Sequence, residues 1–68
     1  MEVILYHQKG CGMCATVEML LKRKNIDYKS VMDIEQMQSE GINHTPALRV
    51  NGELLMGRDI INWINSRG

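Results

Sequence analysis

Two cysteines separated by two residues, Cys11-Gly12-Met13-Cys14, are the side chains of this sequence whose type and spacing best suit chemistry. A disulfide between them would close almost no loop, so it would constrain the unfolded chain very little. Helical positions three apart place their Cβ atoms about 5–6 Å from each other, whereas a disulfide needs roughly 3.5–4.5 Å. Cys11 must therefore lie just outside the helix for the bond to close. Such a bond forms and reopens easily, which indicates redox cycling rather than stapling.

The two cysteines are expected to differ in reactivity because they lie at a boundary between elements. Cys11 falls where a predicted strand over residues 2–7 has ended and a helix begins, and Cys14 lies one turn into that helix. Unpaired backbone N–H groups and the positive end of the helix dipole favour an anion at this point, which lowers the pKa of a thiol. Lys9 adds positive charge, and the flanking glycines leave the sulfur uncrowded. Cys11 is therefore the predicted nucleophile.

The apolar pattern along the chain predicts seven elements in the order β-α-β-α-β-β-α. Predicted strands cover residues 2–7, 27–32, 47–50 and 53–56, and predicted helices begin after Cys11, Asp33 and Gly57. Asn25 is expected to cap the first helix in a left-handed conformation, and Gly41 to stop the second. Asn51-Gly52 supplies the two positive-φ residues of a type I′ hairpin turn.

A strand–helix–strand opening implies a right-handed parallel crossover, and the hairpin adds two antiparallel strands. The expected architecture is thus an α/β fold with a four-stranded mixed sheet whose faces are covered by helices. Sixty-eight residues leave no room for a second core, and the chain contains no repeat or linker. We expect one domain over residues 1–68.

Pro46, the only proline, precedes the hairpin. It either merely starts an edge strand or forms a cis bond that faces the cysteines, since only X-Pro bonds reach cis at low cost. In the second case Thr45 would present its backbone N–H and C=O to an extended substrate, as in strand addition. Met13 is expected to be either a mobile apolar contact for substrates or a half-exposed helix residue.

Composition excludes several classes of function. Eight basic and eight acidic residues give a net charge of zero, which argues against a nucleic-acid or membrane-surface role driven by bulk charge. The longest apolar run, over residues 3–6, is far too short for a transmembrane helix or a signal peptide. The sequence predicts a soluble, cytoplasmic protein, and nothing in it suggests more than a monomer.

The whole pattern resembles the thioredoxin superfamily in its minimal form: C-x-x-C at a helix start, then X-Pro leading into a hairpin and a final helix. The short length resembles the glutaredoxins and the glutaredoxin-like redoxins. The resemblance covers essentially the whole chain. It implies that Cys11 attacks the disulfide of a protein substrate or of a glutathione mixed disulfide, and that Cys14 resolves the resulting mixed disulfide. It also implies a protein without a bound cofactor.

The resemblance further implies a substrate site around Thr45 and a cis Pro46. Arg58 and Asp59 match the pair that holds the γ-glutamyl end of glutathione, the implied reductant. Departures from the glutaredoxin pattern occur at Met56-Gly57 and Ile60 around this pair, and at Gln8 and His44. These changes leave the redox chemistry intact and weaken the case for glutathione. The alternative is a redoxin, an electron donor for example to ribonucleotide reductase, recharged by thioredoxin reductase.

Two other classes of function remain open. One is a metal or iron–sulfur module: either a zinc site in which His7 and His44 complete a Cys2His2 set, or, as the resemblance to glutaredoxins implies, a site whose Cys11 ligands are shared across a dimer. The sequence has no second C-x-x-C or H-x-x-x-H, so we predict no metal site. The other is an interaction domain that kept the fold without catalysis. The two intact cysteines argue against this alternative.

Overall fold

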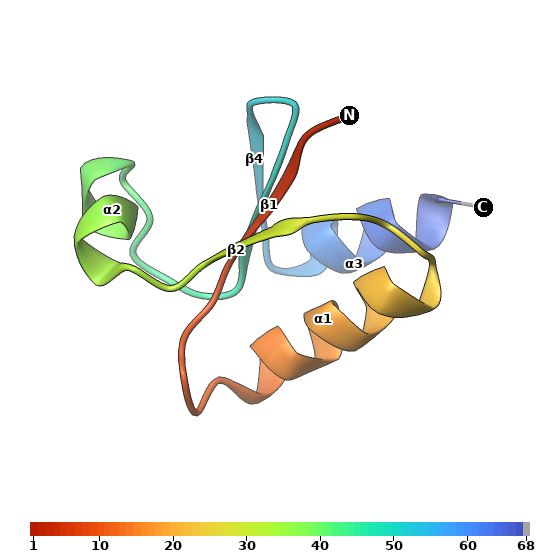
Figure 1. Ribbon diagram of the computed structural model, residues 1–68, viewed down its shortest axis with the longest axis horizontal. Helices are drawn as coiled ribbons and strands as arrows, with labels where there is room; N and C mark the ends of the chain where they lie inside the picture. Colours follow the sequence, from red (N-terminus) through yellow and green to blue (C-terminus); the bar gives the residue numbers. More distant parts are fainter. Residues whose placement is uncertain (68) are drawn as a thin grey trace.

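A computed structural model of the chain describes residues 1–67. Within them, the seven elements follow the predicted order (Figure 1). The strands are β1 (Val3–Tyr6), β2 (Lys29–Val31), β3 (Ala47–Val50) and β4 (Glu53–Met56), and the helices are α1 (Gly12–Arg23), α2 (Ile34–Ser39) and α3 (Arg58–Ser66). None of these helices is long and apolar enough to cross a membrane.

The four strands form one mixed sheet in the order β2-β1-β3-β4. β1 runs parallel to β2, with Tyr6 opposite Val31, and antiparallel to β3, with Tyr6 also opposite Ala47. β3 and β4 form the predicted hairpin, in which Ala47 faces Met56. The turn residues Asn51 and Gly52 both have positive φ, 49° and 91°, as a type I′ turn requires.

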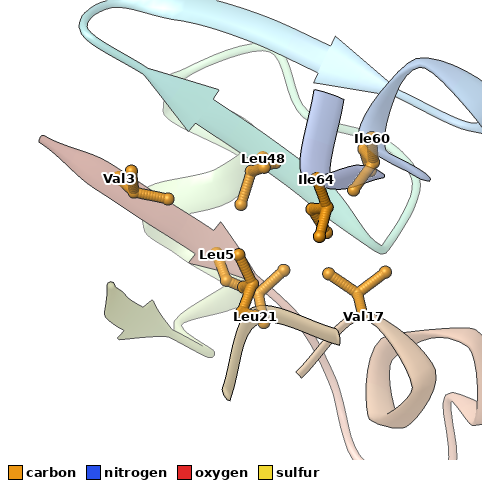
Figure 2. Packing of buried hydrophobic residues seen from close by; sticks show 7 residues of the cluster. All are labelled: Val3, Leu5, Val17, Leu21, Leu48, Ile60 and Ile64. Carbon is orange, nitrogen blue, oxygen red and sulfur yellow. The ribbon is translucent and has the colours of Figure 1, made fainter. Parts of the chain in front are cut away.

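One face of the sheet packs against α1 and α3, and we call it the α1–α3 face. Alternate residues of a strand point to the same side, so β1 and β3 each contribute every second side chain to this face. Figure 2 shows these side chains meeting those of the two helices in a single layer. The fully buried cluster contains Val3, Leu5, Val17, Leu21, Leu48, Ile60 and Ile64. Each such side chain stabilises the fold by about 1.5–3 kcal/mol relative to exposure.

Within residues 1–67, α2, with six residues, is the only helix on the other face of the sheet, and we call this the α2 face. Figure 1 shows α2 set apart from the other two helices. The buried residues here are Tyr6, Met37, Ile42 and Ala47. The carboxylate of Asp33 accepts hydrogen bonds from the backbone N–H groups of Glu35 and Gln36, so it caps α2 as predicted.

Two strands are shorter than the sequence predicts. β2 covers only Lys29–Val31 instead of residues 27–32, and β1 covers Val3–Tyr6 instead of 2–7. The reason for the late start of β2 lies in the preceding turn. Asn25 adopts the predicted left-handed conformation with φ 56°, and the Ile26 N–H donates to the Leu21 carbonyl at the end of α1. The chain is still leaving the helix where the strand was expected.

Candidate redox site

The register of the sheet brings four segments to one edge. Tyr6, at the carboxyl end of β1, lies opposite both Val31 and Ala47, and Ala47 lies opposite Met56. The residues that follow β1, β2 and β4 therefore meet those that precede β3. These segments are 7–11 with the first turn of α1 that follows them, 32–34, 44–46 and 57–59, and in Figure 1 they all lie at the lower end of the sheet. We call this region the redox edge.

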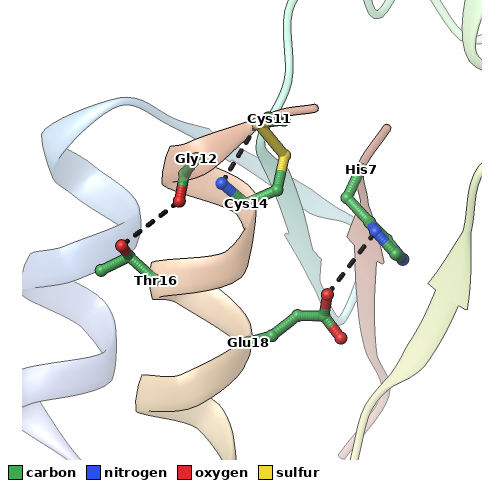
Figure 3. The surroundings of a disulfide bond; sticks show 6 residues. All are labelled: His7, Cys11, Gly12, Cys14, Thr16 and Glu18. Atoms are coloured by element: carbon green, nitrogen blue, oxygen red, sulfur yellow. Dashed lines mark hydrogen bonds and ion pairs between the residues drawn. A yellow bond between two sulfur atoms is a disulfide. The ribbon is translucent and has the colours of Figure 1, made fainter. Parts of the chain in front are cut away.

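At the redox edge, Cys11 and Cys14 are joined by a disulfide, with their Cα atoms 5.2 Å apart (Figure 3). Cys11 is the N-cap of α1 and has extended backbone angles, φ −91° and ψ 102°, so it lies just outside the helix as predicted. Its side chain is partly exposed, whereas that of Cys14 is only 1% exposed. An incoming group can reach Cys11 but not Cys14.

The start of α1 favours negative charge on the Cys11 sulfur. The backbone N–H of Cys14 donates a hydrogen bond to Cys11 Sγ over 3.1 Å. No acidic side chain lies in the first turn of α1, which the structure describes in full, and the exposed Lys9 precedes it by two residues. In the reduced protein, the same N–H and the helix dipole would stabilise a thiolate at Cys11.

Thr45 and Pro46 lead into β3 at the redox edge. Their peptide bond is cis, which was one of the two interpretations that the sequence left open. Among residues 1–67, Thr45 belongs to no strand ladder and takes part in none of the turn or loop hydrogen bonds between backbone groups. Its backbone N–H and C=O are thus free to pair with an extended substrate.

The remaining predicted site residues lie at the same edge. Met13 is in the first turn of α1 with 49% of its surface exposed. Arg58 and Asp59 are the first two residues of α3, and both are exposed. The N-cap of α3, Gly57, has φ 57° and offers no side chain to the free N–H groups of the first turn. These N–H groups and Arg58 could bind a carboxylate by donating hydrogen bonds to it.

A polar pair that the sequence did not predict lies in the surroundings of the disulfide (Figure 3). His7 Nδ1 is 3.7 Å from a carboxylate oxygen of Glu18, and the Tyr28 hydroxyl donates to the other oxygen of Glu18 over 3.0 Å. Burial, with the Glu18 contact, raises the pKa of Tyr28. The pair ties the end of β1 to α1. The sequence signal that could have pointed to Glu18 is its position four residues after Cys14, which places both side chains on the same face of α1.

The geometry offers no support for the Cys2His2 alternative. His7 pairs with Glu18, and His44 is an exposed loop residue. Nowhere in residues 1–67 do three or more histidine, cysteine, aspartate or glutamate side chains gather as a metal ion would require.

Comparison with solved structures shows a thioredoxin-like fold. The chain matches the thioredoxin-like protein BC3987 with a TM-score of 0.75 and 22% identity, over 94% of this chain and 97% of that one. A mutant form of the same protein matches with a TM-score of 0.76 and 22% identity, over 97% of each chain. The glutaredoxin family model matches residues 3–55, and the chain belongs to the glutaredoxin family.

No curated protein matches the sequence. The family, the fold and the Cys11–Cys14 pair together identify a redox-active thiol protein. These same findings confirm the predicted α/β fold with its four-stranded mixed sheet.

Proposed function

We propose that the protein is a thiol–disulfide oxidoreductase that reduces disulfides of proteins or mixed disulfides of glutathione. One observation carries the proposal: the disulfide joins an accessible Cys11, which caps a helix, to a buried Cys14. This asymmetry gives the two sulfurs different tasks. The exposed sulfur meets the substrate, and the buried sulfur reacts only within the protein.

The proposed cycle begins with the reduced protein. The Cys11 thiolate attacks one sulfur of the substrate disulfide, the substrate S–S bond breaks, and the departing thiolate takes up a proton. The Cys14 thiol then loses its proton and attacks Cys11 Sγ. The second substrate thiolate leaves and is protonated in turn. Two electrons and two protons have passed to the substrate, and the Cys11–Cys14 disulfide remains to be reduced by a thiol donor.

The neighbouring residues would hold the substrate during these steps. Thr45 would pair through its backbone N–H and C=O with the segment that carries the disulfide, and Pro46 would set the direction of that backbone. Met13 would contact apolar parts of the substrate. Arg58 and Asp59, at the start of α3, would bind the amino-acid end of glutathione when glutathione is the partner.

A second candidate is a redoxin that donates electrons to a protein and is recharged by thioredoxin reductase. Ile60 favours it, because glutaredoxins usually carry an acid at this position, whereas here the side chain is fully buried in the core. In either case we propose a monomer in a reducing compartment, the cytoplasm, where a thiol pool can reset the pair.

Variants of the two cysteines test the proposal. Cys11→Ser should abolish the reduction of disulfides, and Cys14→Ser should accumulate mixed disulfides with substrates, detectable by mass spectrometry. Retention of dithiol activity in Cys11→Ser would overturn the assignment. The reductant is tested on the oxidised protein with two systems: glutathione with glutathione reductase, and NADPH with thioredoxin reductase. Turnover with the second system alone would identify the redoxin and remove the glutathione roles of Arg58 and Asp59.

A further inference from the structure

Exposed large apolar side chains concentrate at the redox edge. Five such residues stand out among those described: Met1, Met13, Met19, Met32 and Ile34. Three of these five, Met13, Met32 and Ile34, belong to segments that meet at the redox edge, with 49%, 45% and 54% of their surfaces exposed. Apolar side chains left in water beside a reactive group indicate a surface that binds a partner.

Two hollows lie beside these side chains and adjoin one another. The first, about 170 Å³, reaches from the β1–α1 segment to the Thr45 segment, and its lining includes Gln8, Ile34 and Thr45. The second, about 380 Å³, is lined by Gln8, Lys9, Met32 and Ile34. Gln8 and Ile34 line both hollows, so the two are neighbours, and we call them together the Ile34 groove.

The position of the Ile34 groove limits what can occupy it. It begins at Thr45, where the free backbone groups would pair with the chain that presents a disulfide to Cys11. It then runs past Ile34 to Met32 and Lys9. An extended polypeptide advances about 3.3 Å per residue. A segment that pairs with Thr45 therefore places the side chains of its next few residues over Ile34 and Met32.

Glutathione is too short to use the whole groove. Its cysteine is followed by a single glycine, which has no side chain to cover Ile34 or Met32. A protein segment can supply one. Burying an exposed aliphatic side chain is favourable in proportion to the area removed from water. The groove thus discriminates by the side chains that flank the reactive cysteine of the substrate, while the redox chemistry at Cys11 is the same for both substrates.

We propose that the Ile34 groove selects extended protein substrates that carry a large apolar side chain within about three residues of the reactive cysteine. This specificity rests on the oxidoreductase function proposed above. Met32 and Ile34 contact the apolar side chain, and Lys9 lies at the end of the groove. The partner is an unfolded tail or loop of a protein rather than a folded surface, because only an extended chain can follow the groove.

The test compares two peptides that differ at one residue near the cysteine, leucine in one and serine in the other. Each is prepared as a disulfide for turnover, and with serine in place of cysteine for binding. Amide shifts of the wild-type protein should show binding of the leucine peptide at Met32, Ile34 and Thr45. The kcat/KM for the leucine disulfide should exceed that for the serine disulfide about tenfold.

Ile34→Ser should lower kcat/KM for the leucine disulfide much more than for the serine disulfide, and so remove most of this preference. The matched control is Met19→Ser, because Met19 is equally exposed on α1 and lines neither of these two hollows; it should leave both rates unchanged. Equal rates for the two peptides in the wild type, or an equal loss for both in Ile34→Ser, would contradict the proposed specificity of the Ile34 groove without affecting the proposed oxidoreductase function. Binding of the leucine peptide without reduction of either disulfide would contradict the proposed oxidoreductase function and support the Ile34 groove as a binding site.

Discussion

The two faces of the sheet are held in different ways. The α1–α3 face is covered by helices of 12 and 9 residues and closed by seven buried apolar side chains. The α2 face has a six-residue helix, four buried side chains and a polar cluster at the end of α2. In this cluster the Tyr6 hydroxyl donates to Glu40 over 2.8 Å and accepts from Arg49 Nε over 3.3 Å.

The difference separates two tasks. Cys11 and Cys14 lie at the start of α1, and Val17 and Leu21 of this helix are buried in the larger core, so the helix that carries the reacting sulfurs is anchored by apolar packing. The Ile34 groove borders the smaller helix, whose first residue is Ile34 itself. The face that holds the chemistry is thus distinct from the face that would select the substrate.

The largest effect is expected on the α1–α3 face. Leu48 is fully buried in the centre of the sheet. Leu48→Ala should lower the free energy of unfolding by about 3–4 kcal/mol. The substitution removes apolar contacts and leaves a cavity that the two packed helices cannot shift to fill. Denaturant unfolding measures the loss, and the exposed Met19→Ala is the control. A loss below about 1 kcal/mol would mean that this face repacks freely.

A smaller loss is expected on the α2 face. Met37 is the buried residue of α2. Met37→Ala should cost about 2 kcal/mol, near the low end for this substitution, because a helix of six residues can shift to fill the space. Reduction of the Cys11–Cys14 disulfide by dithiothreitol should proceed at the wild-type rate. If Met37→Ala costs more than Leu48→Ala, the ranking of the two faces is wrong.

The polar cluster is expected to contribute less than either apolar contact. Tyr6→Phe keeps the ring and removes a hydroxyl that makes two hydrogen bonds, so it should lower stability by about 1 kcal/mol. The matched control is Tyr28→Phe on the other face, where the hydroxyl makes one hydrogen bond to Glu18. Thermal unfolding should show a larger decrease for Tyr6→Phe, and an equal or reversed order would contradict the role of the cluster.

The smallest effect is a dependence of stability on pH. The hydrogen bond from Tyr6, together with Gln36 and the positive charge of Arg49, holds the pKa of Glu40 below its ordinary value of 4.5. A carboxylate with a lowered pKa stabilises the folded state above that ordinary value, and this contribution is lost as the pH falls through the folded pKa. The wild type should therefore exceed Glu40→Gln in stability at pH 7, and the gap should narrow below pH 4.5.

Unfolding midpoints from pH 7 to pH 3 measure this gap. The control is the same comparison in a Tyr6→Phe background, where the main donor to Glu40 is absent and the gap should be smaller at pH 7. A gap that stays constant from pH 7 to pH 3 would mean that Glu40 acts through its shape rather than its charge.

Most of the fold was predictable because its signals are local. Asp33 caps α2 through the two N–H groups that follow it, Asn51-Gly52 forms its turn within two residues, and Asn25 ends α1 by its own left-handed conformation. Each of these features depends on residues a few positions apart. The sequence predicted β2 to be longer than it is. Its length depends on how many of its residues pair with β1, and only three of them do.

The surroundings of the candidate site were less predictable. The Tyr6 contacts with Glu40 and Arg49 join residues 34 and 43 positions apart, and they require the register of β1 against β3. His7 was considered only as a metal ligand, whereas the packing of α1 places it beside Glu18. The groove between Gln8 and Ile34 depends on where α2 lies relative to the segment after β1, and no periodic pattern in the sequence predicts that position.

By itself the sequence determined the reactive pair at a helix start, the order of the elements and the turns between them, since nearest neighbours along the chain decide capping, dipole and turn conformation. Only the tertiary structure decided that Cys14 is buried, which segments meet at the redox edge, and which apolar side chains stay in water beside it. The physical reason is that burial depends on how the faces of helices and sheet pack, and that packing brings together residues the chain holds far apart.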